Sequence, residues 1–174
     1  MHIFFFNSSG REDPIIYSTA YAFAALKSDG SVVTWGHTDW GGNSSSVQNK
    51  LKGVETIYST TGAYAALLSN GNVVTWGDGE VGGNSSAVEK DLKHGVETIY
   101  STKQAFAARM LDGSVVTWGS AKYGGDSSSV QGDLKKGVVK TIYSNGKAFA
   151  ALMLDKSVVT WGHAGWGGNS SKVQ

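Results

Sequence analysis

The pentapeptide VVTWG occurs four times in this chain, each time inside a longer repeated segment. The four tryptophans of this motif are separated by 41, 42 and 43 residues, and they are Trp35, Trp76, Trp118 and Trp161. A sequence repeats at such a period when each copy is one structural unit that cannot bury its apolar face alone and must stack on a neighbour. The repeat therefore predicts a stacked array of four similar units.

The spacing within each unit is constant, whereas the spacing between units varies. Nineteen residues before each tryptophan stands an isoleucine followed by Tyr and Ser; these are Ile16, Ile57, Ile99 and Ile142. The length differences all lie between the GG pair and the next isoleucine. Because insertions are tolerated in exposed connections and not in paired strands, this segment is predicted to be a surface connector.

Three strands are predicted in each unit, in the order TIYST, AFAALK and SVVTWG. A two-residue hairpin turn with positive φ at both central residues is expected at Asp29-Gly30, Asn70-Gly71 and Asp112-Gly113. The fourth unit has Asp155-Lys156 instead, where lysine would strain such a turn, so a different loop is expected there. The connector SSSVQNKL has the pattern of one helical turn with a serine cap.

Two aromatic positions per unit are predicted to be buried. One is the tryptophan of VVTWG, which we expect in an equivalent, largely buried place in every unit. The other lies in the middle of the alanine-rich strand and is occupied by Phe23, Tyr64, Phe106 and Phe149.

These features predict an all-β protein, a β-propeller of four tandem blade repeats of 41 to 43 residues over 15–174, after an N-terminal apolar segment at 1–14. Helical repeats of this length need long stretches with 3.6-residue periodicity, and β-solenoids repeat at shorter periods. The run Ile3 to Phe6 is shorter than the roughly 7 residues of a signal-peptide core or the roughly 20 of a membrane span. We interpret it as a strand or an interface plug.

Composition excludes several partners and chemistries. The chain has 15 Lys and Arg against 14 Asp and Glu, without the basic excess of a duplex-binding protein, so nucleic acid is not an expected partner. No stretch approaches the length of a membrane span, so a membrane is not an expected partner either. It has no cysteine, which removes disulfides, thiolate metal sites and a cysteine nucleophile but leaves the compartment open.

The repeat also argues against catalysis, because an active site needs different residues in one place whereas a uniform repeat supplies the same ones to each blade. We predict no enzyme activity and no cofactor. His37 and His163 both follow WG, whereas His2 and His94 do not share that position. We interpret this pair as loop histidines rather than metal ligands.

The variable loop after WG holds the candidate binding residues. These are Trp40, Val81, Tyr123 and Trp166, four residues after each WG, together with His37 and His163. Large apolar side chains there are either anchors for a partner or packing against the adjacent blade, and the regular recurrence favours packing. Asn-Ser-Ser at Asn7, Asn43, Asn84 and Asn169 matches the glycosylation pattern but is interpreted as turn chemistry.

The segment IYSTAYAFAALKSDGSVVTWGHTDWGG resembles the repeat of the regulator of chromosome condensation family, and the resemblance extends over residues 15–174. It implies closed propellers, usually of seven blades, that bind other proteins through loops on one face; some members act as nucleotide exchange factors, and a bacterial relative inhibits β-lactamases. Two features depart from the family pattern. The usual histidine before the alanine strand is replaced by alanine, and the GQLG segment reads GGNS or GGDS. The resemblance therefore implies the blade rather than one particular activity.

Two functions are predicted: a non-catalytic protein-binding scaffold, or a structural repeat protein whose main partner is itself. A third, weaker alternative is a multivalent carbohydrate binder that uses Trp40, Tyr123 and Trp166 as stacking platforms. An open arc of four blades leaves unpaired edges and uncovered faces, so we expect a homodimer that closes an eight-bladed ring, or else a filament. The apolar HIFFF segment and the last copy, which stops at GGNSSKVQ, favour assembly. A closed four-bladed monomer is the main rival.

Overall fold

The computed structural model describes residues 13–170. Each predicted unit forms one antiparallel sheet of three strands in chain order, which confirms the predicted meander. We number these sheets blades 1 to 4. Their strands are β1 (Ile15–Ser18), β2 (Ala22–Leu26) and β3 (Val32–Gly36); β4 (Val54–Ser59), β5 (Ala63–Leu68) and β6 (Val73–Gly77); β7 (Val96–Ser101), β8 (Ala105–Met110) and β9 (Val115–Gly119); and β10 (Val139–Ser144), β11 (Ala148–Met153) and β12 (Val158–Gly162).

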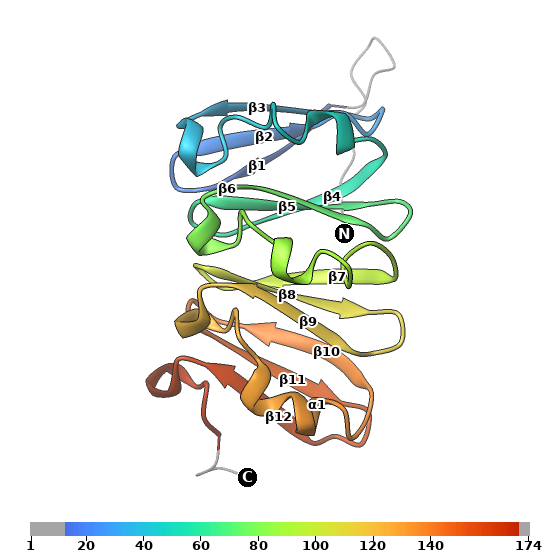
Figure 1. Ribbon diagram of the computed structural model, residues 1–174, viewed down its shortest axis with the longest axis vertical. Coiled ribbons are helices and arrows are strands. Elements are labelled where there is room, and N and C mark those ends of the chain that lie inside the picture. The colour runs from blue at the N-terminus through green and yellow to red at the C-terminus, as the bar shows by residue number, and fades with distance from the viewer. Residues whose placement is uncertain (1–12, 171–174) are drawn as a thin grey trace.

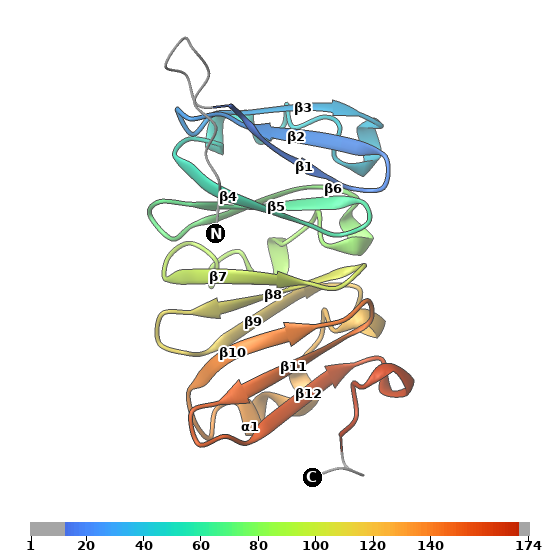
Figure 2. The same ribbon diagram turned by 180° about the vertical axis from the view of Figure 1, so that it is seen from behind.

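The four blades stack face to face in chain order, with blade 1 at one end of the array and blade 4 at the other (Figures 1 and 2). Short 3₁₀ turns follow the third strand of each blade, at Thr38–Trp40, Gly79–Val81, Ala121–Tyr123 and Ala164–Trp166. The connectors hold further 3₁₀ turns at Gln48–Lys50, Ser86–Val88 and Ser128–Val130, and the longest connector adds the short helix α1 (Gln131–Leu134). No helix within 13–170 has the length and apolarity that a membrane span requires.

The strands present two different faces because successive side chains of a strand point to opposite sides. One face of each blade is small and aliphatic, as Ala22, Ala24 and Leu26 are in blade 1. The opposite face carries an aromatic pair, because the mid-strand aromatic residue lies directly opposite the tryptophan of VVTWG, as Tyr64 does opposite Trp76. The two rings stack with centroids 5.0 Å apart. The aromatic face of one blade packs on the alanine face of the blade before it.

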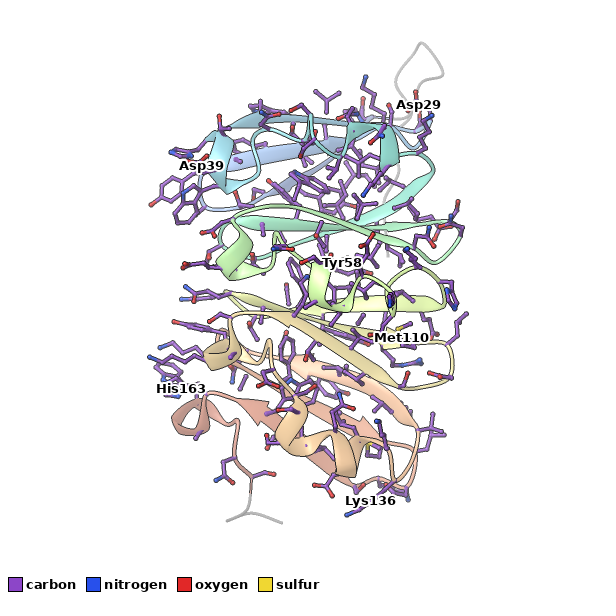
Figure 3. The ribbon with its side chains drawn as sticks, viewed as in Figure 1. Asp29, Asp39, Tyr58, Met110, Lys136 and His163 are labelled. Atoms are coloured by element: carbon purple, nitrogen blue, oxygen red, sulfur yellow. The ribbon has the colours of Figure 1, made fainter. Side chains whose placement is uncertain are left out.

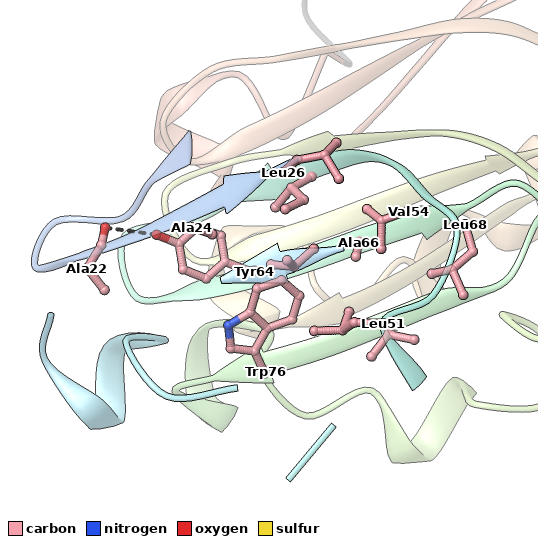
Figure 4. Close-up of a cluster of buried hydrophobic side chains, with 12 residues drawn as sticks. Ala22, Ala24, Leu26, Leu51, Val54, Tyr64, Ala66, Leu68 and Trp76 are labelled. Carbon is pink, nitrogen blue, oxygen red and sulfur yellow. Dashed lines mark hydrogen bonds between the residues drawn. The ribbon is translucent and has the colours of Figure 1, made fainter. Parts of the chain in front are cut away.

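The junction between blades 1 and 2 shows how this packing closes (Figure 4). The Tyr64 ring is completely buried, and its hydroxyl donates a hydrogen bond of 2.8 Å to the Ala22 carbonyl. Burial raises the pKa of Tyr64. Trp76 donates from Nε1 to the Gly41 carbonyl at 3.0 Å, and Trp118 and Trp161 repeat this bond to Gly82 and Gly124.

The prediction that all four aromatic pairs are buried is wrong for blade 1. Trp76, Trp118 and Trp161 are 2 to 4% exposed, whereas Trp35 is 44% exposed and its stacked partner Phe23 is 45% exposed. The cause is position in the array, since within the described residues no blade covers the aromatic face of blade 1. Burial here depends on the neighbouring blade rather than on the residue.

The hairpin turns also differ from the prediction. Gly30 has φ +76°, but Asp29 does not have positive φ. The bond from Gly30 N to the Lys27 carbonyl closes a four-residue turn whose last residue, Gly30, is left-handed. Blade 4 uses the same loop, because Lys156 N bonds to the Met153 carbonyl and Lys156 adopts φ +75°. The expectation of a different loop there is therefore wrong.

Lysine is tolerated at this turn of blade 4 because, within the described residues, no following blade lies close to its Cβ. A Cβ at Gly71 would lie 2.9 Å from Gly95 N, and one at Gly113 would lie 2.3 Å from a methyl group of Val138, both in the next blade's approach to the sheet. At Lys156 the remaining cost is the left-handed backbone itself.

Replacing Lys156 with glycine is expected to raise the free energy of unfolding by roughly 0.5 to 1 kcal/mol. The left-handed conformation costs an L-residue about 1 to 2 kcal/mol, and glycine returns part of that through its greater unfolded-state entropy. Urea unfolding measures the change. Lys156→Ala is the matched control, because it removes the lysine side chain and keeps a Cβ at positive φ; an equal gain from alanine would show that backbone strain is not the cause.

Three of the turns are expected to make stability depend on acid pH. The Ser31 hydroxyl and N–H both donate to Asp29, which lowers the pKa of that carboxyl below its usual 3.8, and Asp112 and Asp155 have the same arrangement. Because the folded-state pKa is lowered, this stability is present above about pH 3.8 and is lost as the pH falls through the lowered values. Blade 2 has Asn70 in the same role, accepting from Asn72 N at 3.0 Å.

Thermal melts between pH 5 and pH 2 test this dependence. We expect the triple variant Asp29→Asn, Asp112→Asn, Asp155→Asn to lose less stability over this range than the parent chain, since amides keep the acceptor and do not titrate. Parallel curves for the two proteins would contradict the assignment.

The connectors are held by the polar residues that the sequence marks as turns. The Asn43 side chain accepts from Ser45 N at 2.9 Å, and Asp126 accepts in the same way from Ser128 N, so an acid replaces the amide without loss of the turn. Ser44 does not cap a helix; it is buried and bonds to Thr34 Oγ1 at 3.0 Å. The glycosylation sequence at Asn7 and the apolar run Ile3 to Phe6 lie outside the described residues.

Candidate binding surface on the loop edge

One long edge of the array gathers the loops that the sequence singles out. We call it the loop edge and define it by the four 3₁₀ turns after the third strands together with the loops between the first and second strands, at residues 19–21, 60–62, 102–104 and 145–147. These two sets of loops are joined within each blade, as the bond from His37 N to the Tyr21 carbonyl shows. Figure 3 places Asp39 and His163 on this edge and Asp29 on the opposite, turn edge.

The backbone of the loop edge is linked from blade to blade. Ala20 N donates to the Thr61 carbonyl at 2.9 Å, Thr61 N to the Lys103 carbonyl at 2.8 Å, and Lys103 N to the Gly146 carbonyl at 3.1 Å. Within blade 2 the Thr60 hydroxyl donates a hydrogen bond of 2.9 Å to the Val81 carbonyl. The same bond is made at the equivalent threonines of blades 1 and 3 and by the Asn145 amide in blade 4. The loops are therefore held in one repeated frame.

The side chains on this frame differ between blades, and the acidic and basic side chains lie on different blades. The central position of the 3₁₀ turn holds Asp39 in blade 1, Glu80 in blade 2 and Lys122 in blade 3. Neighbouring residues add further charges of the same sign: Asp78 lies in blade 2, Lys103 in blade 3 and Lys147 in blade 4. Blades 1 and 2 thus present carboxylates on this edge, and blades 3 and 4 present ammonium groups.

The four predicted loop residues occupy one structural position with different exposure. Trp40 is half-buried: it lies against Gly62 of blade 2, where an added Cβ would come 2.8 Å from the indole ring, and it meets Tyr21 edge-on at 4.7 Å. Val81 is buried in the core between blades 2 and 3. Tyr123 is half-buried against blade 4, with the Lys147 ammonium 5.9 Å from its ring.

Trp166 differs from these three, since it is 55% exposed and the Lys147 ammonium lies 4.3 Å from its ring centre. The position therefore serves as packing wherever a following blade is present, and it offers an open aromatic ring in blade 4. Of the three rings considered as carbohydrate platforms, Trp166 is the exposed one, and Trp40 and Tyr123 lie in contacts between blades.

The structure does not bring His37 and His163 together within one chain. His37 is in blade 1 and His163 in blade 4, at opposite ends of the stack, and the described residues contain no group of three potential His, Asp or Glu metal ligands. The Nδ1 atom of His163 is buried without a hydrogen-bond partner in residues 13–170.

Sequence reasoning missed part of this surface. It did not identify Tyr21, Lys103 or Lys147, which lie in the short loops after the Ile-Tyr-Ser strands. The sequence does contain a signal for these residues. The loops read TAY, TTG, TKQ and NGK, so they vary in sequence although the strands on either side of them are nearly constant.

The larger hollows in the described residues lie mainly beneath the connectors, and a smaller one of about 190 Å³ reaches the loop edge at Asn145. Two open grooves of about 640 Å³ each run beneath the connectors. One is lined by the Asp133, Lys136 and Val158 region, and the other by the Val47, Leu68 and Leu92 region. The loop edge itself is suited to a surface contact rather than to an enclosed small molecule.

No family model matches the chain, and no curated protein matches its sequence. Its fold is similar to propellers of known structure. Yeast RCC1 (Prp20) bound to Kap60 matches with a TM-score of 0.60 at 13% identity over 90% of this chain and 45% of that one. Prp20p of Saccharomyces cerevisiae, studied with Gsp1p and histones, gives 0.59 at 20% identity over 89% and 45%. The WD40 ectodomain of the Arabidopsis thaliana receptor kinase ACR4 gives 0.57 at 16% identity over 90% and 55%.

The chain spans about half the length of each of these structures. At these identities the likeness shows the fold: four antiparallel blades arranged as in RCC1 and WD40 propellers.

Proposed function

We propose that this protein is a non-catalytic scaffold that binds another protein through the loop edge. The observation that carries the proposal is a constant backbone frame on which equivalent positions hold different side chains, such as Asp39, Glu80 and Lys122. Rigidly held loops with variable side chains are the usual means by which a repeated scaffold presents a recognition surface. Propeller neighbours that are described with protein partners, namely Kap60, Gsp1p and histones, support a protein as the ligand class.

The charges indicate what such a partner presents. Carboxylates of blades 1 and 2 and ammonium groups of blades 3 and 4 favour a surface with basic groups facing one half and acidic groups facing the other, because complementary charge steers association and sets orientation. The exposed ring of Trp166 supplies an aromatic anchor at the basic end.

The test compares partners recovered by two variants. Reversing the basic half with Lys103→Glu and Lys122→Glu is expected to abolish capture of the partner by the immobilised chain and to weaken the salt dependence of what remains. The control Lys50→Glu and Lys93→Glu makes the same charge change in the connectors, and it is expected to retain the partner. Equal recovery by both variants would show that the loop edge is not the binding surface.

A second role, assembly with further copies of the same chain, is favoured by a separate observation. The aromatic face of blade 1 and the alanine face of blade 4 are both uncovered in the described residues, although each is buried at all three internal junctions. Soluble repeat proteins normally cover apolar sheet faces of this kind. Light scattering at micromolar concentration tests this role, and a mass of one 18.3 kDa chain would contradict it.

A further inference from the structure

The two outer faces of the array are the two halves of one interface. We call the first the head face, formed by Ile16, Phe23, Val33 and Trp35 of blade 1, and the second the tail face, formed by Tyr143, Ala150, Leu152 and Val158 of blade 4. At the internal junctions the residues equivalent to the head face always pack on those equivalent to the tail face. Figures 1 and 2 show the two outer sheets at opposite ends of the stack.

We infer that a second copy of this chain docks head-to-tail, with the head face of one copy on the tail face of the other. The inference rests on the assembly role proposed above and adds its orientation and its contacts. Three internal junctions provide the template, since equivalent faces meet at each of them and the strand register within the blades is the same.

The polar atoms of the two faces are complementary. At internal junctions the tryptophan Nε1 donates to a glycine carbonyl of the preceding blade, at 3.0 to 3.1 Å. In residues 13–170 Trp35 makes no such bond, and the equivalent acceptor is the Gly167 carbonyl of blade 4. Docking gives this donor and this acceptor to each other.

Gly167 also leaves the space that the Phe23 ring requires. Gly41, Gly82 and Gly124 each face the aromatic ring of the following blade so closely that an added Cβ would come within 2.6 Å of it. At Gly167 the nearest atom to such a Cβ is 3.9 Å away, in the Asn145 side chain. Blade 4 has the glycine at this position, and within the described chain no aromatic ring occupies the space beside it.

The tyrosine that closes each junction is likewise available. Tyr58 and Tyr100 bond through their hydroxyls to Thr98 and Thr141 of the next blade, and Tyr17 reaches blade 2 in the same way. Tyr143 is the equivalent residue of blade 4 and is 62% exposed. Blade 1 has Ile15 in place of the threonine, so the Tyr143 ring packs there without this hydrogen bond.

A charge pair marks the turn edge of this junction. Inside the chain, Val54 N donates to the Gly30 carbonyl, and the two later junctions repeat this bond. The equivalent of the valine in blade 1 is Asp13, and the equivalent of the glycine in blade 4 is Lys156. Opposite charges therefore stand where the two copies meet, in place of an apolar residue and a glycine. A Cβ at the equivalent Gly71 would lie 2.9 Å from Gly95 N of the next blade, so the Lys156 turn must shift slightly as the second copy docks.

The experiment uses one variant on each face. Trp35→Glu inactivates the head face and Tyr143→Glu the tail face. Trp35 is 44% exposed and Tyr143 is 62% exposed, so each single chain is expected to stay folded by circular dichroism. The parent chain is expected to have twice the mass of one 18.3 kDa chain by light scattering, or a larger mass if copies continue in a line. Each variant alone is expected to be a single chain, with the dissociation constant of the assembly raised by about 30-fold or more.

Mixing the two variants is the decisive step. The intact tail of Trp35→Glu can accept the intact head of Tyr143→Glu, so the mixture is expected to form a pair with one junction. The control Leu111→Glu changes a side chain that is 73% exposed and belongs to neither face, and it is expected to assemble like the parent. If Tyr143→Glu alone still assembled while Trp35→Glu did not, the contact would be head-to-head, and this inference would fail while the assembly role would stand.

Charge reversal gives an independent readout. Asp13→Lys or Lys156→Asp alone is expected to weaken assembly by about twofold to fivefold, in the range of exposed ion pairs, and the double exchange is expected to restore it. Absence of restoration would place these two residues away from the junction and would contradict the docking register. A parent chain that remains single at all concentrations would overturn both the inference and the assembly role, without bearing on binding by the loop edge.

Discussion

Replacing Trp118 with alanine is expected to lower the free energy of unfolding by about 3 to 5 kcal/mol, the usual cost of truncating a buried aromatic side chain. Trp118 is 4% exposed, it stacks on Phe106 with centroids 5.2 Å apart, and its Nε1 donates to the Gly82 carbonyl of the preceding blade at 3.1 Å. The substitution therefore opens a cavity and leaves a carbonyl without its donor. Urea unfolding followed by tryptophan fluorescence or circular dichroism measures the loss.

Trp35→Ala is the matched control for this experiment, since it removes the same side chain from the same strand position. Trp35 is ten times more exposed and is expected to contribute only about 1 to 2 kcal/mol, in proportion to the apolar area that remains covered. Both substitutions are made in the Tyr143→Glu background, so that docking of a second copy does not stabilise Trp35. Equal losses would mean that burial by the preceding blade does not determine the contribution of this residue.

The second large effect is expected at Gly82, where alanine should lower the free energy of unfolding by about 2 to 5 kcal/mol. The added Cβ would lie 2.6 Å from Cδ2 and 2.7 Å from Cε2 of Phe106, whose buried ring cannot move away. Overpacking of this kind costs about 1 to 3 kcal/mol. Gly82 also has φ +108°, a backbone conformation that costs an L-residue about 1 to 2 kcal/mol.

Gly167→Ala separates these two contributions. Gly167 has a similar φ of +96° but no ring beside it within the described chain, so alanine is expected to cost only the backbone term of about 1 to 2 kcal/mol. Chemical denaturation of both variants in the Tyr143→Glu background gives the difference, which reports the contact between blades. A loss at Gly167 as large as that at Gly82 would show that backbone strain accounts for the whole effect.

The repeat alone was sufficient to predict the architecture. The constant distance from Ile16 to Trp35 and from Ile57 to Trp76 implies paired strands, and the structure has the same registers in all four blades. The length differences fall in the connectors as predicted, and the longest connector accommodates them with the helix α1. Local spacing was informative because strand pairing and side-chain alternation are properties of each unit by itself.

The turns were predicted less well, because two turn types share one sequence signal. Asp-Gly suits a two-residue hairpin as well as the observed turn with a single left-handed residue, and only the hydrogen bond from Gly30 N to the Lys27 carbonyl distinguishes them. The sequence also could not show why Lys156 is tolerated. That depends on the absence of a following blade near its Cβ within the described chain.

The candidate surface was predicted in part. The loop after WG was identified from its variability, but Tyr21, Lys103 and Lys147 come from a second set of loops that joins it only through the hairpin fold. The separation of the charged side chains of this surface into an acidic and a basic half follows from the order in which the blades stack. Linear charge counts do not reveal it, since the chain as a whole is nearly neutral.

The sequence by itself therefore determined the unit: three strands, an aromatic face, an alanine face and a connector. Only the tertiary structure decided which faces are buried, because a sheet face in a stacked array is covered by the next unit and not by its own residues. Four nearly identical aromatic pairs thus divide into three buried pairs and the exposed pair Phe23 and Trp35. The same reason leaves Tyr143 and Trp166 open at the other end, and it makes these two faces the place where further blades would add.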